Sequence, residues 1–469
     1  MKESKLFNSD WLNPILVKEV RQFFHNKFFT TLVAGLLGLQ LLMLFIFTLA
    51  QKEWQNSSSA GTVSTGTVFM VLDTILMYFC VFCSAVWSPM QRFSQERASK
   101  ELDFANITLL TPFQIISGKL ASSLVIWLLI AALCLPFMTI AYFFRGITPK
   151  EIVLIFALGI MPALMLIQAA LFCGALGKKL YQGLFLFFCL QVLPLVIGSC
   201  GAVLFGRTIP WWGIFWLLQG GGLLLFLLLF AATTALVTPP FANRMFTLRL
   251  ITGAAFTAVL GVFPFTGSFS KNMMVCFCCF PFGLFGVTAL LNACDRDEPG
   301  NRVLEKVPRA FPGRFCHYLL SSNRTGGAVF SWLLLTLAML MLWFLSFSEK
   351  TSLLLLSVSA GAYFLFYSYL AIFLHRSCKE VPGWAWLLIV SGAMGVAPML
   401  LTLDSSFKAE EIFLSPISLF NIDGAPTFSD LRFQLPLLAV WMTGAYFVVE
   451  MCVKFKKYKS PVHSHKESV

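Results

Sequence analysis

The sequence predicts an all-α fold: a polytopic membrane protein with about twelve transmembrane helices in two six-helix bundles. Of its 469 residues, 58% are hydrophobic and only 12% are charged, whereas soluble proteins carry about 25% charged residues. Apolar runs of about 20 residues recur, and each is long enough to cross about 30 Å of hydrocarbon. Lys and Arg are concentrated in alternate connecting segments, as in proteins that cross the membrane repeatedly.

The apolar runs fall into two groups of six expected spans. The first group lies near Thr30–Ala50, Thr67–Trp87, Ser117–Phe144, Ile152–Leu176, Gly183–Phe205 and Trp211–Leu236. The second group lies near Leu250–Thr266, Met273–Leu291, Gly326–Phe347, Ser352–Leu374, Trp384–Leu403 and Pro436–Val453. The seventh span is short for a crossing and contains both Gly and Pro.

The basic residues predict that both termini lie in the cytoplasm. With the N-terminus inside, the inner segments hold 26 of the 34 Lys and Arg residues and the outer segments hold 8. Such a bias is the usual mark of the cytoplasmic face, and it predicts a multi-pass protein of the cytoplasmic (inner) membrane. Contact with anionic lipid accounts for the net charge of +12, so no nucleic-acid partner is expected.

Polar segments divide the chain into expected regions. Residues 1–29 are expected to form a cytoplasmic amphipathic helix, and residues 30–250 the first six-helix unit, which includes a cytoplasmic segment at 88–119. The second bundle is expected to start with residues 251–291 and to continue, after a cytoplasmic linker at 292–325, with residues 326–453. Residues 454–469 form a basic cytoplasmic tail.

The residues that would carry chemistry are mostly absent. All five histidines fall in expected inner loops or near inner ends of spans, so no span offers paired imidazoles for haem or zinc. No phosphate-binding Gly-x-x-x-x-Gly-Lys loop occurs, and most of the 13 cysteines lie inside apolar runs, where a thiol behaves as a small hydrophobe. We therefore expect no catalytic residues, no metal site and no cofactor bound by this chain.

Carboxyl groups inside a membrane often mark ion or proton paths, and the expected spans contain two. Asp73 lies about two turns inside the outer end of the second span, and Glu450 lies near the inner end of the last. Asp73 is the candidate intramembrane site. The alternative is that its carboxylate reaches outer water or bonds to a neighbouring helix.

The stretch WLNPILVKEVRQFFHNKFF, before the first span, predicts an amphipathic helix. Asn13 can cap it, and Pro14 suits the first helical position, where no N–H is needed. Its apolar face is expected to carry Leu16, Val20, Phe23 and Phe24. Such a helix either rests on the inner leaflet or docks on another part of the protein.

The stretch ERASKELDFANITLLTPFQIISGKL, residues 96–120, is a charged insert between two apolar runs. Good helix formers from Gln91 to Leu110 predict a helix, which Thr111-Pro112 ends. The chain then enters the third span, with Lys119 at the membrane boundary. The insert is either a solvated inner loop or an element that passes motion to the third span.

These two segments, in this order, resemble the permeases of type 2 ATP-binding-cassette (ABC) transporters over about residues 10–250. In that family an N-terminal connecting helix and a coupling helix after the second span receive motion from a cytoplasmic ATPase. The resemblance places on the connecting helix Asn13, Pro14, Lys18, Glu19 and Arg21. It places on the ATPase-coupling segment Glu96, Arg97, Lys100, Glu101, Leu102, Asp103, Thr111, Pro112, Gly118 and Lys119.

The resemblance implies the permease subunit of an ABC exporter, with ATP and Mg²⁺ held by separate ABC ATPase subunits. The substrate is unidentified, and a Phe-rich bundle with mostly short outer loops suits a lipidic or hydrophobic one. The second half is then either a diverged permease unit, which makes one chain a pseudo-dimer, or an accessory bundle on a homodimer. Two other functions stay open: a secondary transporter driven by an ion gradient through Asp73, and a membrane-embedded enzyme that modifies lipids.

Overall fold

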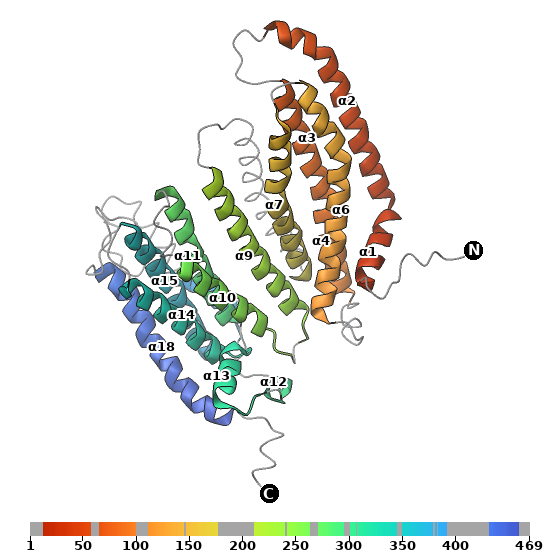
Figure 1. Cartoon of the computed structure of the whole chain (residues 1–469). Coiled ribbons are helices and arrows are strands. Elements are labelled where there is room, and N and C mark those ends of the chain that lie inside the picture. Colours follow the sequence, from red (N-terminus) through yellow and green to blue (C-terminus); the bar gives the residue numbers. More distant parts are fainter. Residues whose placement is uncertain are drawn as a thin grey trace. The chain divides into compact units, whose positions relative to one another are not determined.

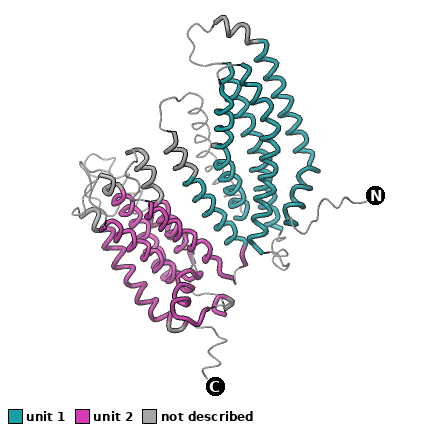
Figure 2. The backbone as a smooth tube through the Cα atoms, in the orientation of Figure 1, with its two compact units in different colours: residues 1–237 teal, residues 238–469 magenta. Residues whose placement is uncertain are grey.

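The structure is a computed structural model, and all of the regular secondary structure in its described residues is helical. It describes residues 13–57, 65–99, 111–144, 147–176, 211–239, 242–262, 271–294, 301–305, 307–344, 349–378, 380–381, 383–391 and 431–458. The chain forms two compact units, residues 1–237 and 238–469 (Figure 2).

Unit 1 begins with a short helix, α1 (Pro14–Phe24), and continues with long apolar helices (Figure 1). These are α2 (Lys27–Ser57), α3 (Thr65–Val81), the π-helix η1 (Phe82–Trp87), α4 (Ser88–Ala98), α6 (Pro112–Ile140), the 3-10 turn η2 (Ala141–Phe144), α7 (Pro149–Leu176) and α9 (Trp211–Val237).

The second expected span is part of a much longer helix than its apolar run indicates. α3, η1 and α4 follow one another without a break, from Thr65 to Ala98. At about 1.5 Å per residue, 34 residues extend about 51 Å, against about 30 Å of hydrocarbon. The helix is therefore about 20 Å longer than a perpendicular crossing needs, and α4 is its last segment.

One apolar core holds unit 1 together. Buried side chains of α3, α6 and α7 pack in it, among them Phe69, Ile116, Ile130 and Leu171. On α2, by contrast, many large apolar side chains are exposed, including Leu41 and Phe45. Exposed apolar surface of this kind suits hydrocarbon, since lipid tails and not water surround such a helix.

Unit 2 consists of helices of two kinds. The long apolar ones are α10 (Phe246–Val262), α11 (Lys271–Cys294), α14 (Arg324–Phe344), α15 (Glu349–Ser377) and α18 (Leu431–Lys457). The shorter ones are α12 (Asn301–Glu305), α13 (Phe311–Leu320) and α16 (Gly383–Ser391).

Close helix packing in unit 2 depends on small residues. Gly361 on α15 lies so close to the ring of Phe285 on α11 that a Cβ atom at position 361 would collide with it. Small residues let membrane helices approach closely and gain dispersion contacts. These contacts stabilise the packing, because in lipid no hydrophobic effect drives the helices together.

Eight described segments are long and apolar enough to cross a membrane: Lys27–Leu49, Thr65–Ala98, Pro112–Phe144, Pro149–Leu176, Gly220–Val237, Arg324–Leu342, Leu354–Ser377 and Pro436–Phe455. The chain is thus a helical, multi-pass membrane protein. Near the expected seventh and eighth spans lie α10 (Phe246–Val262) and the segment Gly283–Ala293 of α11, which are apolar but shorter than these eight segments. The expected span Gly183–Phe205 lies outside the described residues, as does most of Trp384–Leu403.

Candidate functional site

The first helix starts as the sequence predicts. The Asn13 side chain accepts a hydrogen bond from the backbone N–H of Ile15 at 3.1 Å, and Pro14 occupies the first turn of α1. The cap satisfies one of the N–H groups that a helix start leaves without an intrahelical partner. α1 therefore has a defined first turn and a fixed starting point.

The break at Thr111-Pro112 is the start of α6. Thr111 and Gln114 form a capping box: the Gln114 N–H donates to Thr111 Oγ1 at 3.3 Å, and the Thr111 N–H donates to Gln114 Oε1 at 2.9 Å. Pro112 stands in the first turn. This cap and proline begin the helix five residues before the expected start of the third span at Ser117.

α1 docks directly on this exposed start of α6. The Asn13 Nδ2 group donates to the backbone oxygen of Gln114 at 2.6 Å. A Cβ atom at Gly118 would lie 2.8 Å from Asn13 Nδ2 and 2.9 Å from the Cβ atom of Ile15. The missing side chain at Gly118 is thus what allows the two helices to touch.

The face of α1 that turns inward differs from the expected apolar face. Glu19 and Phe23 are its buried residues, and Ile15 packs against the core from the same face. Phe24, expected on the apolar face, is exposed. The apolar pattern did not indicate that Glu19 would be buried, because a carboxylate can be buried when it meets a buried cation.

That cation is Lys119, which lies at the centre of a three-residue ion cluster. Lys119 Nζ lies 2.6 Å from Glu19 Oε1 on α1 and 2.8 Å from Glu96 Oε2 on α4. The side chains of Lys119, Glu19 and Glu96 are only 7%, 10% and 19% exposed. We call these three residues the Lys119 cluster.

The aromatic ring of Phe93 lies against the Lys119 cluster, and a second cation–π contact joins α4 to α1. Lys119 Nζ lies 5.0 Å from the ring centroid of Phe93 on α4, a cation–π distance. The guanidinium of Arg92 lies 5.7 Å from the ring of Phe23 on α1. α4 also packs on α7, where Gly174 lies so close that a Cβ atom there would be 2.9 Å from the Met90 carbonyl oxygen.

The remaining residues that the sequence placed at this site have mixed positions. Lys18 and Arg21 are on the exposed side of α1, and Arg97 is half-buried near the end of α4. Lys100, Glu101, Leu102 and Asp103 lie outside the described residues. The structure thus brings together eight of the predicted residues around one helix junction: Asn13, Pro14, Glu19, Glu96, Thr111, Pro112, Gly118 and Lys119.

The geometry of this junction suits mechanical transmission. One ammonium group, that of Lys119, connects three helices. Its partners Glu19 and Glu96 lie 100 and 23 residues before it in the sequence. In the described part of the chain, no group of three or more His, Cys, Asp or Glu side chains could hold a metal ion. The two ion pairs hold α1, α4 and the start of α6 against one another.

Asp73 bonds to a neighbouring helix, which is one of the two arrangements considered from sequence. It is fully buried, and Asp73 Oδ1 accepts a hydrogen bond from Gln40 Nε2 on α2 at 2.8 Å. The carboxylate therefore does not reach outer water. Sequence reasoning missed Gln40, although a Gln in the middle of an apolar span is itself a signal of a buried polar contact.

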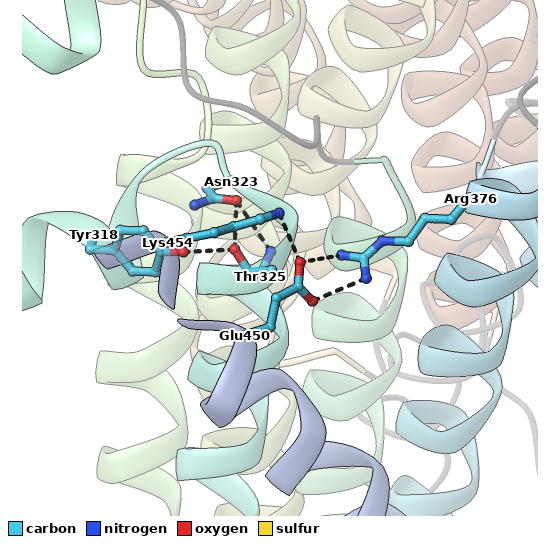
Figure 3. Close-up of polar contacts among 6 residues, drawn as sticks. All are labelled: Tyr318, Asn323, Thr325, Arg376, Glu450 and Lys454. Carbon is cyan, nitrogen blue, oxygen red and sulfur yellow. Dashed lines mark hydrogen bonds and ion pairs between the residues drawn. The ribbon is translucent and has the colours of Figure 1, made fainter. Parts of the chain in front are cut away.

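Glu450 is occupied by ion pairs near the end of α18. Its two oxygens accept hydrogen bonds from Arg376 Nη1 and Nη2 on α15 at 3.0 and 2.9 Å, and Lys454 Nζ lies 2.8 Å from Oε1 (Figure 3). Nearby, Asn323 caps α14 through the Thr325 N–H, and Tyr318 bonds to the Thr325 hydroxyl at 2.7 Å. A bidentate pair of this kind positions helices and leaves little capacity for an ion in transit.

Sequence reasoning also missed a buried arginine in unit 2. Arg249 is 1% exposed and donates to the backbone oxygens of Leu319, Ser321 and Asn323. From the sequence it counted only as one inner basic residue. Its acceptors are carbonyl groups about 70 residues away, which no side-chain pattern can reveal.

Comparison with known proteins adds no relative. Neither protein-family models, nor curated proteins, nor solved structures give a match to this chain. The functional interpretation therefore depends on the geometry of the site and on the motifs in the sequence.

Proposed function

We propose that the chain is the membrane-spanning permease subunit of an ABC transporter, an exporter in the cytoplasmic membrane with both termini in the cytoplasm. Separate ATPase subunits bind ATP and Mg²⁺ and hydrolyse the nucleotide. The chain itself is not an enzyme and holds no cofactor. It converts movement of the ATPases into a change of access within the helical bundle.

The single observation that carries this proposal is the Lys119 cluster. It links a helix before the first span, the projecting end of the second span and the start of the third. A push on the end of α4 would pass through Glu96 and Lys119 into α6, and through Glu19 into α1. A solvated loop would have no need of a buried ammonium that joins three helices.

The proposed docking surface for the ATPase is the charged segment that directly follows α4. Lys100, Glu101 and Asp103 come within five residues of the end of α4 at Ala98. A partner that binds these charges would therefore act at the end of a helix that is continuous with the second span. Because Glu96 is bound inside the chain, the ATPase would contact residues beyond it.

The substrate class follows from the composition and the expected topology. The chain contains 50 Phe residues, and its expected outer loops are short except for Asp404–Gln434, so a large soluble cargo has little to bind. A hydrophobic or lipidic substrate fits this surface best. The direction, export, follows from the resemblance of the two motifs.

The test is to co-express the chain with candidate ATPases encoded beside it, purify the complex in lipid nanodiscs and measure ATP hydrolysis and transport. We expect a stable complex. Reversing Glu101 and Asp103 together to Lys should abolish the complex, while Lys119→Met should leave ATPase binding largely intact and uncouple hydrolysis from transport. Lys150→Met, at the exposed start of α7 and outside both predicted segments, is the control.

Two results would overturn the proposal. One is transport by the chain alone in vesicles without any ATPase. The other is a complex that forms and transports normally with both Glu101 and Asp103 reversed. The mass of the complex also distinguishes one chain with two ATPases, a pseudo-dimer, from a homodimer of the chain.

A secondary transporter driven by an ion gradient is the second candidate, favoured by the buried Asp73–Gln40 contact. It predicts transport that collapses with the gradient and disappears in Asp73→Asn, with no dependence on ATP. The permease predicts transport that depends on ATP and survives dissipation of the gradient.

A further inference from the structure

The proposed permease function assigns no role to the buried polar pair that Gln40 on α2 forms with Asp73 on α3. Both residues are 0% exposed, and both lie inside segments long enough to cross the membrane. A single hydrogen bond, from Gln40 Nε2 to Asp73 Oδ1, joins them at 2.8 Å. A carboxyl group at such a position is costly and needs an explanation of its own.

Two oxygens of the pair, one on each side chain, receive no hydrogen bond. They are Gln40 Oε1 and Asp73 Oδ2, both buried. An amide oxygen and an ionised carboxylate can only accept, so the two cannot satisfy each other while Asp73 is charged. Leaving buried acceptors without donors costs about 1–3 kcal/mol each, and more for a charged group.

One proton satisfies both oxygens. A proton on Asp73 Oδ2 turns that acceptor into an O–H donor, and Gln40 Oε1 is an acceptor without a donor. Gln40 Nε2 continues to donate to Oδ1. The neutral acid and the amide then exchange two hydrogen bonds, in the same reciprocal way as two paired amides.

We propose that Asp73 and Gln40 form a proton-binding site between α2 and α3, in which the protonated carboxyl group and the carboxamide exchange two hydrogen bonds. The ligand is a single proton. Its release would leave a buried carboxylate facing an amide oxygen, and this repulsion would weaken the packing of α2 on α3. The site thus makes the contact between these two spans dependent on protonation.

Among the side chains that the structure describes on α2, α3 and α6, none places an opposite charge beside Asp73. On α2, α3 and α6 the other charged side chains that the structure describes are Lys27 and Lys119. Lys27 is 13 residues before Gln40 on α2, which is about 20 Å along the axis. Lys119 is bound in its own cluster at the start of α6.

The titratable groups near the pair are thiols. Cys134 on α6 interacts with both Asp73 and Gln40, and Cys80 follows Asp73 on α3 within range of Cys134. Neither thiol donates a hydrogen bond to the two open oxygens. A neutral thiol carries no charge that could balance an ionised Asp73.

The first test is infrared difference spectroscopy of the purified full chain in lipid nanodiscs without any ATPase. We expect a carboxylic-acid C=O band at neutral pH that disappears in Asp73→Asn. In Gln40→Leu, which removes the acceptor of the O–H, the band should shift or be lost. A spectrum in which Asp73→Asn removes only carboxylate bands would overturn the proposal.

The second test is thermal unfolding of the same samples across pH. Asp73→Asn places an NH₂ donor where the proposed O–H lies, so it should keep the wild-type melting temperature at neutral pH. The wild type should lose stability as the pH rises, because the unfolded chain releases this proton before the folded chain does. Asp73→Asn should not show that loss.

Gln168→Leu is the matched control, since Gln168 on α7 donates to Thr233 at 2.8 Å in a buried contact without a carboxyl group. It should lower the melting temperature without changing its pH dependence. The proposal fails if Asp73→Asn destabilises the chain as much as Gln40→Leu at every pH. It also fails if added Na⁺ or K⁺ stabilises the wild type but not Asp73→Asn, which would identify a metal cation. Neither result bears on the permease proposal, whose test is complex formation.

Discussion

Replacing Lys119 by Met removes the only cation of the Lys119 cluster and leaves Glu19 and Glu96 buried beside each other. We expect α1 to separate from α6. Each carboxylate lies 2.6–2.8 Å from Lys119 Nζ, which corresponds to about 6 kcal/mol of attraction per pair at an effective dielectric constant of about 20. Desolvation offsets much of this attraction, and removing one partner of a buried pair typically costs 3–5 kcal/mol. Because the side chains are partly exposed, we take the lower value, about 3 kcal/mol.

The assay is hydrogen–deuterium exchange of the α1 amides in lipid nanodiscs, which reports local opening of this helix. A cost of about 3 kcal/mol corresponds to a loss of protection on the order of 100-fold, at about 1.4 kcal/mol per factor of ten. Amides of α14 in unit 2 should keep their protection, which serves as an internal control. Lys18→Met should change the exchange of α1 little, because Lys18 is exposed.

Two further variants separate charge from packing. Glu19→Gln and Glu96→Gln should each cost less than Lys119→Met, since Lys119 keeps one carboxylate in either case. The triple variant Glu19→Gln, Glu96→Gln, Lys119→Met removes every charge and should regain most of the lost protection. If Lys119→Met leaves α1 as protected as in the wild type, the cluster does not hold the junction and the proposed route of transmission is wrong.

Gly118→Ala should weaken the docking of α1 by about 1–3 kcal/mol, because the new methyl group would lie 2.9 Å from the Cβ atom of Ile15. Gly38→Ala on α2, where nothing lies within 4 Å, should instead stabilise its helix by about 0.5–1 kcal/mol. Equal effects of the two variants in thermal unfolding would contradict this account. Burial lowers the pKa of His317 below its usual 6.5, so the unfolded chain takes up a proton before the folded chain does. Stability should therefore fall as the pH drops below about 6.5, by up to about 1.4 kcal/mol per unit. His317→Gln should lose this pH dependence in unfolding experiments, and an unchanged slope would refute the assignment.

Local features of the helices could be predicted from residues close together in the sequence. Asn13-Pro14 and Thr111-Pro112 begin helices in the structure as their chemistry requires. These caps depend on side chains and amides within three residues of each other, so no knowledge of the fold is needed to place them.

The extent of the second helix could not be predicted from its apolar run. Hydropathy indicates only the segment that lipid surrounds. α4 continues the helix with polar residues such as Gln95 and Glu96, and it is stabilised by packing against α7 and by the contact of Glu96 with Lys119. A polar segment that is stabilised by tertiary contacts has no periodic signal of its own.

By itself, the sequence determined that this protein is helical, that it lies in a membrane and where its polar segments interrupt the apolar ones. Lipid demands long apolar helices with internally bonded backbones, and that demand is visible in composition alone. Only the tertiary structure decided that Glu19, Glu96 and Lys119 meet, and that Asp73 faces Gln40. Burial of a charge is tolerable only beside its partner, and these partners are 23 to 100 residues apart, so the folded arrangement of the helices brings them together.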